Sequence, residues 1–429
     1  MEHTWQSRAL SIHGFLTMLL AFLLPVSKKL VPPVIVLWAL TSFFLFRSAN
    51  AKLGWKELLP LLAYYFCNVV WIIGSEDKDA AYFSLEVKAS LLVFPAIWLF
   101  VPQFELRRRL DVLLAFIWGC IGFALFSLLR ALWFYLIDPE VGMFGSHFLG
   151  KWLNFRIGDI GVFYYAELGW YFHPTYLATY EAFALVVLGR MYSRKVFALG
   201  KPWVHHLTAA LLIIHIGLLS SRAGYLCALL ALLLVAMLQF KRKRTKEAIA
   251  YLILGISLLA SVVLFSPTSQ KRLEEAVRPK TTDVISDNAE VSVKASSSTS
   301  GRMVAWKTAV EVLIDHPLGV GTGDVENELM IRYELAGEDY AARKHMNPHN
   351  QFLQAGVAFG WPGIFTLCLV FLMGFLLALK RKDFLFLSFL LLLGLNMLFE
   401  SFLEVQSGVV FIAFFFTFFV KSPTHKTYA

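Results

Sequence analysis

Apolar residues occur in this chain as long runs, separated by short clusters of polar and charged residues. A run of roughly 18 or more apolar residues is long enough to cross the hydrocarbon layer of a bilayer as a helix. The pattern predicts an all-α polytopic membrane protein with about twelve transmembrane helices. The expected spans are 9–26, 31–46, 57–74, 89–104, 110–136, 175–193, 204–220, 223–240, 248–266, 352–379, 384–400 and 404–420.

Composition supports the membrane assignment. Of the 429 residues, 58% are hydrophobic and only 16% are charged, whereas a soluble domain carries roughly a quarter charged residues. A transmembrane β-barrel would show short alternating strands instead. The four cysteines, Cys67, Cys120, Cys227 and Cys368, fall inside apolar spans without metal or disulfide spacing, so we interpret them as packing residues.

The placement of the basic residues predicts which loops face the cytoplasm. Basic clusters follow every second span, at 47–56, 107–109, 194–201, 241–244, 380–382 and 421, with Lys28 and Lys29 as the exception. Because short cytoplasmic loops are rich in Lys and Arg, both termini are expected in the cytoplasm. The opposite loops would then face outward, into the periplasm if the cell is Gram-negative. The net charge of +9 therefore predicts no nucleic-acid partner.

One opposite loop, 267–351, is too long for a plain connector. It begins with a Ser-rich piece, and a helix is expected over 302–315, where Trp306, Ala309, Val310 and Leu313 would form one apolar stripe. Pro317 and the glycines after it break this helix, and a second helix is expected over 324–335. The predicted organisation is transmembrane helices 1–9 in 1–266, a periplasmic loop domain in 267–351, and helices 10–12 with a cytoplasmic tail in 352–429.

Two arginines lie where predicted spans meet the outer surface. Residues 204–240 are too long for one span, so a turn near 220–224 would place Arg222 at that surface. Arg302 lies one helical turn before Trp306, on the side of the apolar stripe. Each arginine has two interpretations: contact with lipid headgroups, or an anion site that faces the bundle interior.

Residues 345–351 place histidines and amides at the mouth of an apolar span. His345 and His349 have the spacing of a helical metal site, but Pro348 disfavours helix at the residue before it and no acidic residue completes a ligand set, so we predict no metal. His349 can accept a proton near neutral pH, and Asn350 and Gln351 can orient a ring or a hydroxyl-rich ligand. A plain interfacial histidine is the alternative.

Other polar residues are interpreted as structural. His173 and His215 are expected to stabilise the fold, Glu86 and Lys88 to form a local ion pair, and Glu181 to face the bundle interior. The sequence contains no P-loop, dinucleotide fingerprint, nucleophile elbow or zinc signature, and no cofactor is predicted.

Three motifs follow one another along the chain: "SSRAG" at 220–224, "SGRMVAWKTAVEVLIDHPLGVGTG" at 300–323 and "NPHNQFLQAGVAFGWPG" at 347–363. Together and in this order they resemble the O-antigen ligase/polymerase superfamily, and "SLEVKASLLVFPAIW" at 84–98 also resembles the fourth-span region of many members. The chain departs from the family at Asn347, where many members carry a second histidine.

The resemblance implies a GT-C-like glycosyltransferase of the bacterial inner membrane that is inverting, independent of metals and active on the periplasmic face. Its donor would be an O-antigen linked to undecaprenyl pyrophosphate, and a ligase would transfer this glycan to the lipid A core oligosaccharide. Arg222 and Arg302 match the family's essential arginines, and His349 matches its essential histidine. Asn350, Trp306 and Gln351 are predicted as supporting residues, and membrane lipids as further partners.

Three alternatives remain at this point. The chain is similar in the same motifs to repeat-unit polymerases and to protein O-oligosaccharyltransferases, which use other acceptors. A transporter for small anions would use the outer arginines as an entry funnel. Transport needs ionisable residues along a path at mid-membrane depth, and apart from Glu181 and His215 the spans contain few.

Overall fold

The computed structural model describes residues 2–45, 55–99, 101, 106–137, 141–142, 160–163, 165–196, 198–265, 274, 281–285, 291–295 and 298–422. The helices that coincide with predicted spans are α1 (Glu2–Leu23), α2 (Val31–Phe43), α3 (Trp55–Val70), α4 (Lys78–Lys88) with α5 (Ser90–Leu99), α6 (Leu106–Ile137), α9 (Pro174–Ser193), α10 (Pro202–Leu218), α11 (Arg222–Lys241), α12 (Thr245–Phe265), α17 (Gln351–Arg381), α18 (Phe384–Met397) and α19 (Gln406–Lys421). The prediction of helices at these positions is confirmed.

Among the described residues, four helical stretches are long and apolar enough to span a membrane. They are Lys78–Trp98, Arg107–Ile137, Arg222–Lys241 and Gln351–Arg381, and shorter apolar helices accompany them. A polytopic membrane protein fits this arrangement, and the number of twelve crossings stays a prediction. The fourth predicted span begins earlier than expected, because Asp77 accepts a hydrogen bond from the backbone N–H of Ala80 and caps α4.

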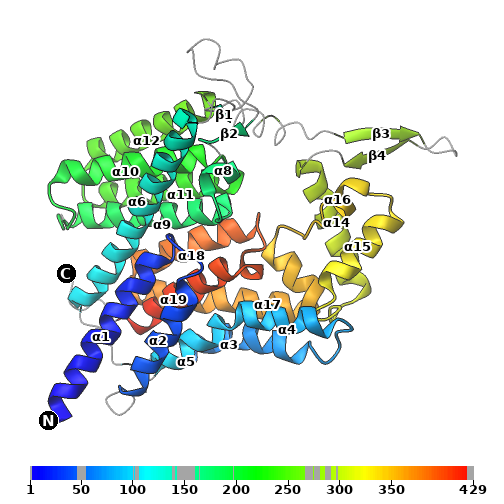
Figure 1. Cartoon of the computed structure of the whole chain (residues 1–429), viewed down its shortest axis with the longest axis horizontal. Coiled ribbons are helices and arrows are strands. Elements are labelled where there is room, and N and C mark those ends of the chain that lie inside the picture. Colours follow the sequence, from blue (N-terminus) through cyan, green and yellow to red (C-terminus); the bar gives the residue numbers. More distant parts are fainter. Residues whose placement is uncertain are drawn as a thin grey trace.

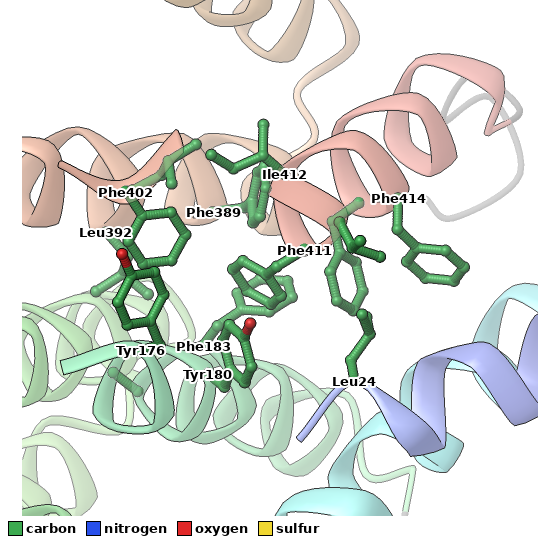
Figure 2. Close-up of a cluster of buried hydrophobic side chains, with 14 of the residues drawn as sticks. Leu24, Tyr176, Tyr180, Phe183, Phe389, Leu392, Phe402, Phe411, Ile412 and Phe414 are labelled. Carbon is green, nitrogen blue, oxygen red and sulfur yellow. The ribbon is translucent and has the colours of Figure 1, made fainter. Parts of the chain in front are cut away.

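Helix α9 lies at the centre of the fold, with almost all of its residues buried against α6, α10, α11 and α18. Its aromatic side chains hold the C-terminal elements in place (Figure 2). Tyr176 stacks on Phe402 with ring centroids 4.6 Å apart, and Tyr180 stacks on Phe411 at 4.3 Å. Because lipid provides no hydrophobic drive between helices, such close packing is what holds a membrane bundle together.

A buried polar chain also joins α9 to its neighbours. Nδ1 of His215 lies 2.7 Å from Oε1 of Glu181, and Nε2 of His215 lies 2.8 Å from Oγ of Ser127. Both Glu181 and His215 are fully buried. Glu181 therefore faces the bundle interior as predicted, and its contact assigns His215 a structural role.

Helices α14 (Ser298–Asp315), α15 (Val325–Leu335) and α16 (Asp339–Arg343) gather at one end of the bundle (Figure 1). Both helices predicted in the long loop are confirmed. The predicted stripe is wrong at Val310, which is 43% exposed, whereas Ala305, Ala309 and Val312 are fully buried. The buried face of α14 is therefore rotated from the predicted one, and it packs on α17.

A loop after α14 fixes this end of the molecule to α17. The backbone N–H of Val320 donates to the carbonyl of Val357 (2.9 Å), and that of Trp361 donates to the carbonyl of Pro317 (3.0 Å). These bonds are possible because α17 is kinked at Gly360, whose φ of 65° interrupts the helical ladder. These two hydrogen bonds, together with the packing of α14 on α17, hold Arg302 on α14 in a fixed position relative to α17.

Short segments complete the fold. Helix α8 (Tyr165–Gly169) precedes α9, and the 3-10 helix η2 (Phe402–Glu404) precedes α19. Two small sheets depart from the all-α prediction: β1 (Val141–Gly142) pairs in parallel with β2 (Ile160–Gly161), and β3 (Thr281–Ile285) pairs antiparallel with β4 (Val291–Ala295). The predicted division into three domains is not tested by this arrangement.

Candidate active site

Arg222 is the first residue of α11, directly after the predicted turn. Ser221 caps the helix by accepting a hydrogen bond from the backbone N–H of Gly224 (3.2 Å). The hydroxyls of Ser221 and Thr175 lie 2.9 Å apart, which joins the start of α11 to the start of α9. A Cβ at Gly224 would meet Ala178 at 2.6 Å, so glycine is what permits this close approach. The turn therefore holds Arg222 beside the first turn of α9.

Arg222 and Arg302 line the same small cavity, together with Tyr165, His173, Thr175, Ser221 and Ala223. Its volume is about 30 Å³, which is room for roughly two water molecules. The enclosed space alone is therefore smaller than a pyrophosphate. The two arginines come from helices far apart in the chain, and His173, interpreted as structural from the sequence, lines the same cavity.

Glu400 connects Arg302 to His349. Its Oε1 lies 3.2 Å from Nδ1 of His349, and its Oε2 lies 3.8 Å from a terminal nitrogen of Arg302. The carboxylate is only 6% exposed. Burial alone would raise the pKa of Glu400, but the hydrogen bond and charge of His349, with the charges of His173 and Arg302, lower this pKa below its ordinary value. Glu400 is therefore ionised at neutral pH and can only accept hydrogen bonds.

Arg302 keeps part of its hydrogen-bonding capacity. Its Nε has no hydrogen-bond partner among the described residues, and its contact with Glu400 is longer than a hydrogen bond. A guanidinium offers five donors in a planar fork that matches phosphate oxygens. The side chain as a whole is 23% exposed although Nε is buried, so a ligand that enters from outside reaches the terminal N–H groups first.

His349 is held by an unusual backbone conformation. Its φ is 45°, a left-handed value that is uncommon outside glycine, and its N–H donates to Oδ1 of Asn347 (2.8 Å). Residues 345–349 are not helical, so the helical metal spacing of His345 and His349 is not realised. His345 instead contacts Glu326, with Nδ1 2.9 Å from Oε1.

The predicted supporting residues have local contacts of their own. Asn350 is the N-cap of α17, and its side chain accepts from the backbone N–H groups of Phe352 and Leu353. Gln351 is fully buried. Its Oε1 accepts from the N–H of Leu403 (2.6 Å), and its Nε2 donates to Oε1 of Glu404 (3.0 Å). Both amide side chains therefore stabilise the start of α17. Because the oxygen and the nitrogen of the Gln351 amide are both hydrogen-bonded within the protein, Gln351 is not expected to bind a ligand.

Trp306, the third predicted supporting residue, is half-buried, and its Nε1 has no hydrogen-bond partner among the described residues. It lies on α14 one turn after Arg302. No contact of its ring with His349 or Arg222 is found in the described part of the chain, so its supporting role stays a prediction.

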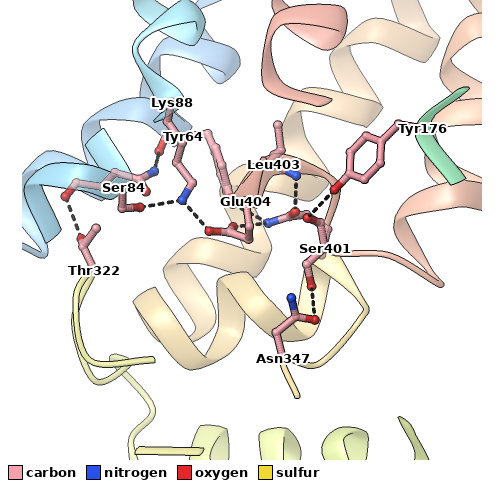
Figure 3. A network of polar contacts seen from close by, with 11 residues as sticks. Tyr64, Ser84, Lys88, Tyr176, Thr322, Asn347, Ser401, Leu403 and Glu404 are labelled. Atoms are coloured by element: carbon pink, nitrogen blue, oxygen red, sulfur yellow. Dashed lines mark hydrogen bonds and ion pairs between the residues drawn. The ribbon is translucent and has the colours of Figure 1, made fainter. Parts of the chain in front are cut away.

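Lys88 and Glu404 form a partly buried ion pair (Figure 3), and Glu404 also accepts a hydrogen bond from Gln351. Nζ of Lys88 lies 2.6 Å from Oε2 of Glu404 and donates to the hydroxyl of Ser84 (2.7 Å). The side chain of Lys88 is 3% exposed. The predicted local ion pair of Lys88 with Glu86 is therefore wrong, because residues two apart on a helix point in different directions.

A second, larger cavity of about 260 Å³ lies beside Asn347. It is lined by Ala80, Phe83, Ser84, Val87, Lys88, Thr322, Gly323, Val325, Glu326, Leu329, His345, Met346, Asn347, Gln354 and Glu404. Asn347 links it to the site, since the same side chain accepts from the N–H of His349. Gln354 is 8% exposed, and its Oε1 has no partner among the described residues. Polar groups thus dominate one wall of this cavity.

Comparison with known protein families gives a match over the middle of the chain. A family described as O-antigen ligase matches residues 207–368. This match supports the O-antigen ligase/polymerase superfamily for residues 207–368. The matched stretch contains Arg222, Arg302 and His349, and the family implies a glycosyltransferase-like enzyme that acts on lipid-linked glycans in general. No curated protein matches the chain.

Sequence reasoning missed Glu400 and assigned His173 a structural role. The sequence does contain a signal for Glu400, because a carboxylate at the end of an otherwise apolar span is costly unless it has a partner. Its partners could not be read from the sequence, since Arg302 and His349 belong to other elements. The geometry thus brings together all three residues predicted to carry the chemistry, and adds Glu400 between two of them.

Proposed function

We propose that this protein is an O-antigen ligase: an inverting, metal-independent glycosyltransferase that moves O-antigen polysaccharide from undecaprenyl pyrophosphate to the lipid A core oligosaccharide, on the periplasmic face of the inner membrane. The observation that supports this most is the convergence of the site. Arg222 and Arg302 line one cavity, and Glu400 joins Arg302 to His349.

The arginines would bind the pyrophosphate of the donor. Guanidinium groups bind phosphate oxygens through paired hydrogen bonds, and the partly exposed guanidinium of Arg302 would provide such donors. When the bond between the anomeric carbon and the phosphate oxygen breaks, negative charge grows on the leaving pyrophosphate. Cationic groups fixed beside that charge lower the barrier without a metal ion.

His349 would act as the general base. Because ionised Glu400 can only accept, Nδ1 of His349 carries the hydrogen that lies between them. The other ring nitrogen, Nε2, is then the one that accepts a proton. It would take the proton of the acceptor hydroxyl while the hydroxyl oxygen bonds to the anomeric carbon and the electron pair of the broken bond leaves with undecaprenyl pyrophosphate. General-base catalysis of this kind contributes roughly 10²–10⁴-fold.

The larger cavity would receive the acceptor sugar. Asn347 belongs both to its wall and to the hydrogen bond that holds His349. The uncommitted Oε1 of Gln354 and the carboxylate of Glu326 can accept from sugar hydroxyls. The donor phosphates and the acceptor hydroxyl would thus approach His349 from two different cavities.

Transfer by the purified full-length protein tests this proposal. A lipid-pyrophosphate-linked glycan and a lipid A core acceptor are mixed with the protein in the presence of a chelator, and glycosylated acceptor is measured. We expect product from the unaltered protein, and a loss of about tenfold or more in Arg222→Lys and Arg302→Lys, because lysine lacks the paired donors. Arg343→Lys is the matched control, since Arg343 is exposed on α16 at the same end.

Activity at normal rates in both arginine variants would contradict the site assignment. A deletion strain separates ligase from polymerase. Loss of a ligase leaves full-length polymer on the lipid carrier, whereas loss of a polymerase leaves single repeat units on the lipid A core. Transfer of the glycan to a protein acceptor, with none to lipid A core, would instead identify a protein O-oligosaccharyltransferase.

A further inference from the structure

Lys28 and Lys29, the exceptions to the distribution of basic residues along the chain, lie in the turn between α1 and α2. Nζ of Lys28 lies 5.9 Å from the ring centre of Tyr171. The hydroxyl of Tyr171 donates to the carbonyl of Val26 in the same turn, so this ring is fixed against the backbone that carries both lysines. Tyr171 belongs to the segment between α8 and α9, and it thus joins two parts of the chain that are far apart in sequence.

Arg130 on α6 contacts the neighbour of Tyr171 in the chain. The central carbon of its guanidinium lies 5.4 Å from the ring centre of Trp170, and the rings of Trp170 and Tyr171 have centroids 4.6 Å apart. A cation over an aromatic face is attracted by the electrons of the ring, so the two rings hold Lys28 and Arg130 in one group. We call this group the basic–aromatic cluster, and its members are Lys28, Lys29, Arg130, Trp170 and Tyr171.

The basic–aromatic cluster lies at the end of the bundle that carries the candidate active site. Trp170 and Tyr171 come shortly before His173, which lines the cavity of Arg222. Along α6, which is long and apolar enough to span a membrane, Arg130 lies about 31 Å from Arg109. This length is close to the thickness of the hydrocarbon core of a bilayer, so Arg130 is expected at the level of the lipid headgroups.

Positive charge in the cluster has no acidic partner in the described part of the chain, where Lys28, Lys29 and Arg130 form no ion pair. Glu167 contacts Arg130 through its backbone carbonyl, which accepts from a terminal guanidinium nitrogen (2.8 Å), rather than through its carboxylate. A guanidinium has five N–H donors and an ammonium group has three. Most of these donors are therefore available to an anion.

The surroundings of the cluster restrict the kind of anion. Phe126, Leu129, Trp133 and Phe134 of α6 and Trp170 itself are between 39% and 65% exposed. A small hydrophilic anion gains nothing from such side chains, whereas an amphiphile covers them with its hydrocarbon. A zwitterionic headgroup brings an ammonium group that the three cations repel. We propose that the cluster binds the phosphate headgroup of an anionic phospholipid, with the first part of an acyl chain against the exposed aromatic side chains.

Lipid binding to the purified full-length protein tests this proposal. The protein is delipidated in detergent and titrated with phosphatidylglycerol, with zwitterionic phosphatidylcholine or with inorganic phosphate, and bound molecules are counted by native mass spectrometry. We expect phosphatidylglycerol to bind about tenfold or more tightly than phosphatidylcholine, because each basic residue near a membrane surface strengthens the attraction of an anionic lipid about fivefold. Lys28→Gln/Arg130→Gln should lose most of this preference.

The control removes the same charge outside the cluster. Arg343→Gln/Lys344→Gln changes two exposed basic residues at the end of α16, and it should keep the preference for phosphatidylglycerol. If the Arg130 variant does not fold because the bond to Glu167 is lost, Lys28→Gln/Lys29→Gln changes only side chains that form no hydrogen bond in the described part of the chain. This lysine pair should still weaken the preference several-fold.

Four results would overturn the proposal. They are an unaltered protein without preference for the anionic lipid, cluster variants that keep the preference, a control pair that weakens it as much as the cluster variants do, and inorganic phosphate that binds as tightly as the lipid and displaces it. Because glycan transfer is not part of the measurement, the outcome does not depend on whether the chain is an O-antigen ligase.

Discussion

Replacing Glu400 by glutamine tests the link between Arg302 and His349. Glutamine keeps the size of the side chain and removes its charge. In the native structure Oε1 of Glu400 lies 3.2 Å from Nδ1 of His349 in a setting where the carboxylate is only 6% exposed. The neutral amide keeps an oxygen that can accept this hydrogen bond, but it can also turn its NH₂ group toward the ring. The variant therefore weakens both the orientation of the imidazole and the stabilisation of its protonated form.

The size of the effect follows from the kind of contact. A hydrogen bond to a charged group contributes about 1.5–3 kcal/mol, and each 1.36 kcal/mol of barrier changes a rate tenfold. If the whole contact supports the transition state, kcat/KM should fall roughly 10- to 150-fold. The charge of Glu400 also acts on Arg302, but that contact of 3.8 Å is longer than a hydrogen bond, so its loss adds less.

The assay is transfer of glycan from the lipid pyrophosphate to the acceptor by the purified protein, with kcat and KM measured for each substrate. Glu328→Gln is the matched control, because Glu328 lies on α15 at the same end and also contacts a histidine, with 3.9 Å between its Oε1 and Nε2 of His316. The control should keep full activity. A Glu400→Gln variant with unchanged kcat/KM would refute the reasoning that this carboxylate positions His349.

Three further predictions concern stability, each measured by thermal or denaturant unfolding in detergent. Lys88→Met should lower the free energy of unfolding by about 3 kcal/mol, because the carboxylate of Glu404 loses its ion-pair partner. This value is near the lower limit for a broken buried pair, since the Glu404 side chain is 23% exposed to water. An unchanged unfolding midpoint would show that the pair is not formed. Gly360→Ala should lower the free energy of unfolding by about 1–3 kcal/mol, because the φ of Gly360 is 65° and an added Cβ would meet the carbonyl of Pro317. A Gly360→Ala variant as stable as the unaltered protein would argue against the kink in α17. The pKa of the Glu400 carboxyl is lower in the folded protein than in the unfolded chain, so the unfolded chain binds a proton at Glu400 more readily. The stabilisation that ionised Glu400 gives the fold is therefore complete above pH 4.5 and is lost as pH falls through the lower native pKa. The melting temperatures of the unaltered protein and Glu400→Gln should converge in that pH range, and a constant difference would contradict the assignment.

The helices could be predicted from the sequence because hydrophobic run length is set by bilayer thickness, a constraint that acts on each segment separately. The turn before Arg222 follows from the same constraint, since 204–240 exceeds the length of one span. Arg302 could be placed on a helix of the long loop because the sequence there has helical periodicity. These conclusions needed only local information.

The contacts between segments could not be predicted in that way. Lys88 pairs with Glu404, which lies more than 300 residues later in the chain, and nothing near Lys88 in the sequence indicates that partner. The rotation of α14 that exposes Val310 and buries Val312 depends on how α14 packs on α17. Glu400 acquires its role only because the fold brings it between Arg302 and His349.

The central claim is that Arg222 and Arg302 hold one pyrophosphate together, and a double-mutant cycle tests it most directly. Binding of undecaprenyl pyrophosphate is measured for the unaltered protein, Arg222→Gln, Arg302→Gln and the double variant. Two residues that contact the same ligand group should show a coupling energy of about 0.5–3 kcal/mol, so the double variant should lose clearly less affinity than the sum of the single losses. Additive losses, or single variants that bind the pyrophosphate as tightly as the unaltered protein, would contradict a shared site.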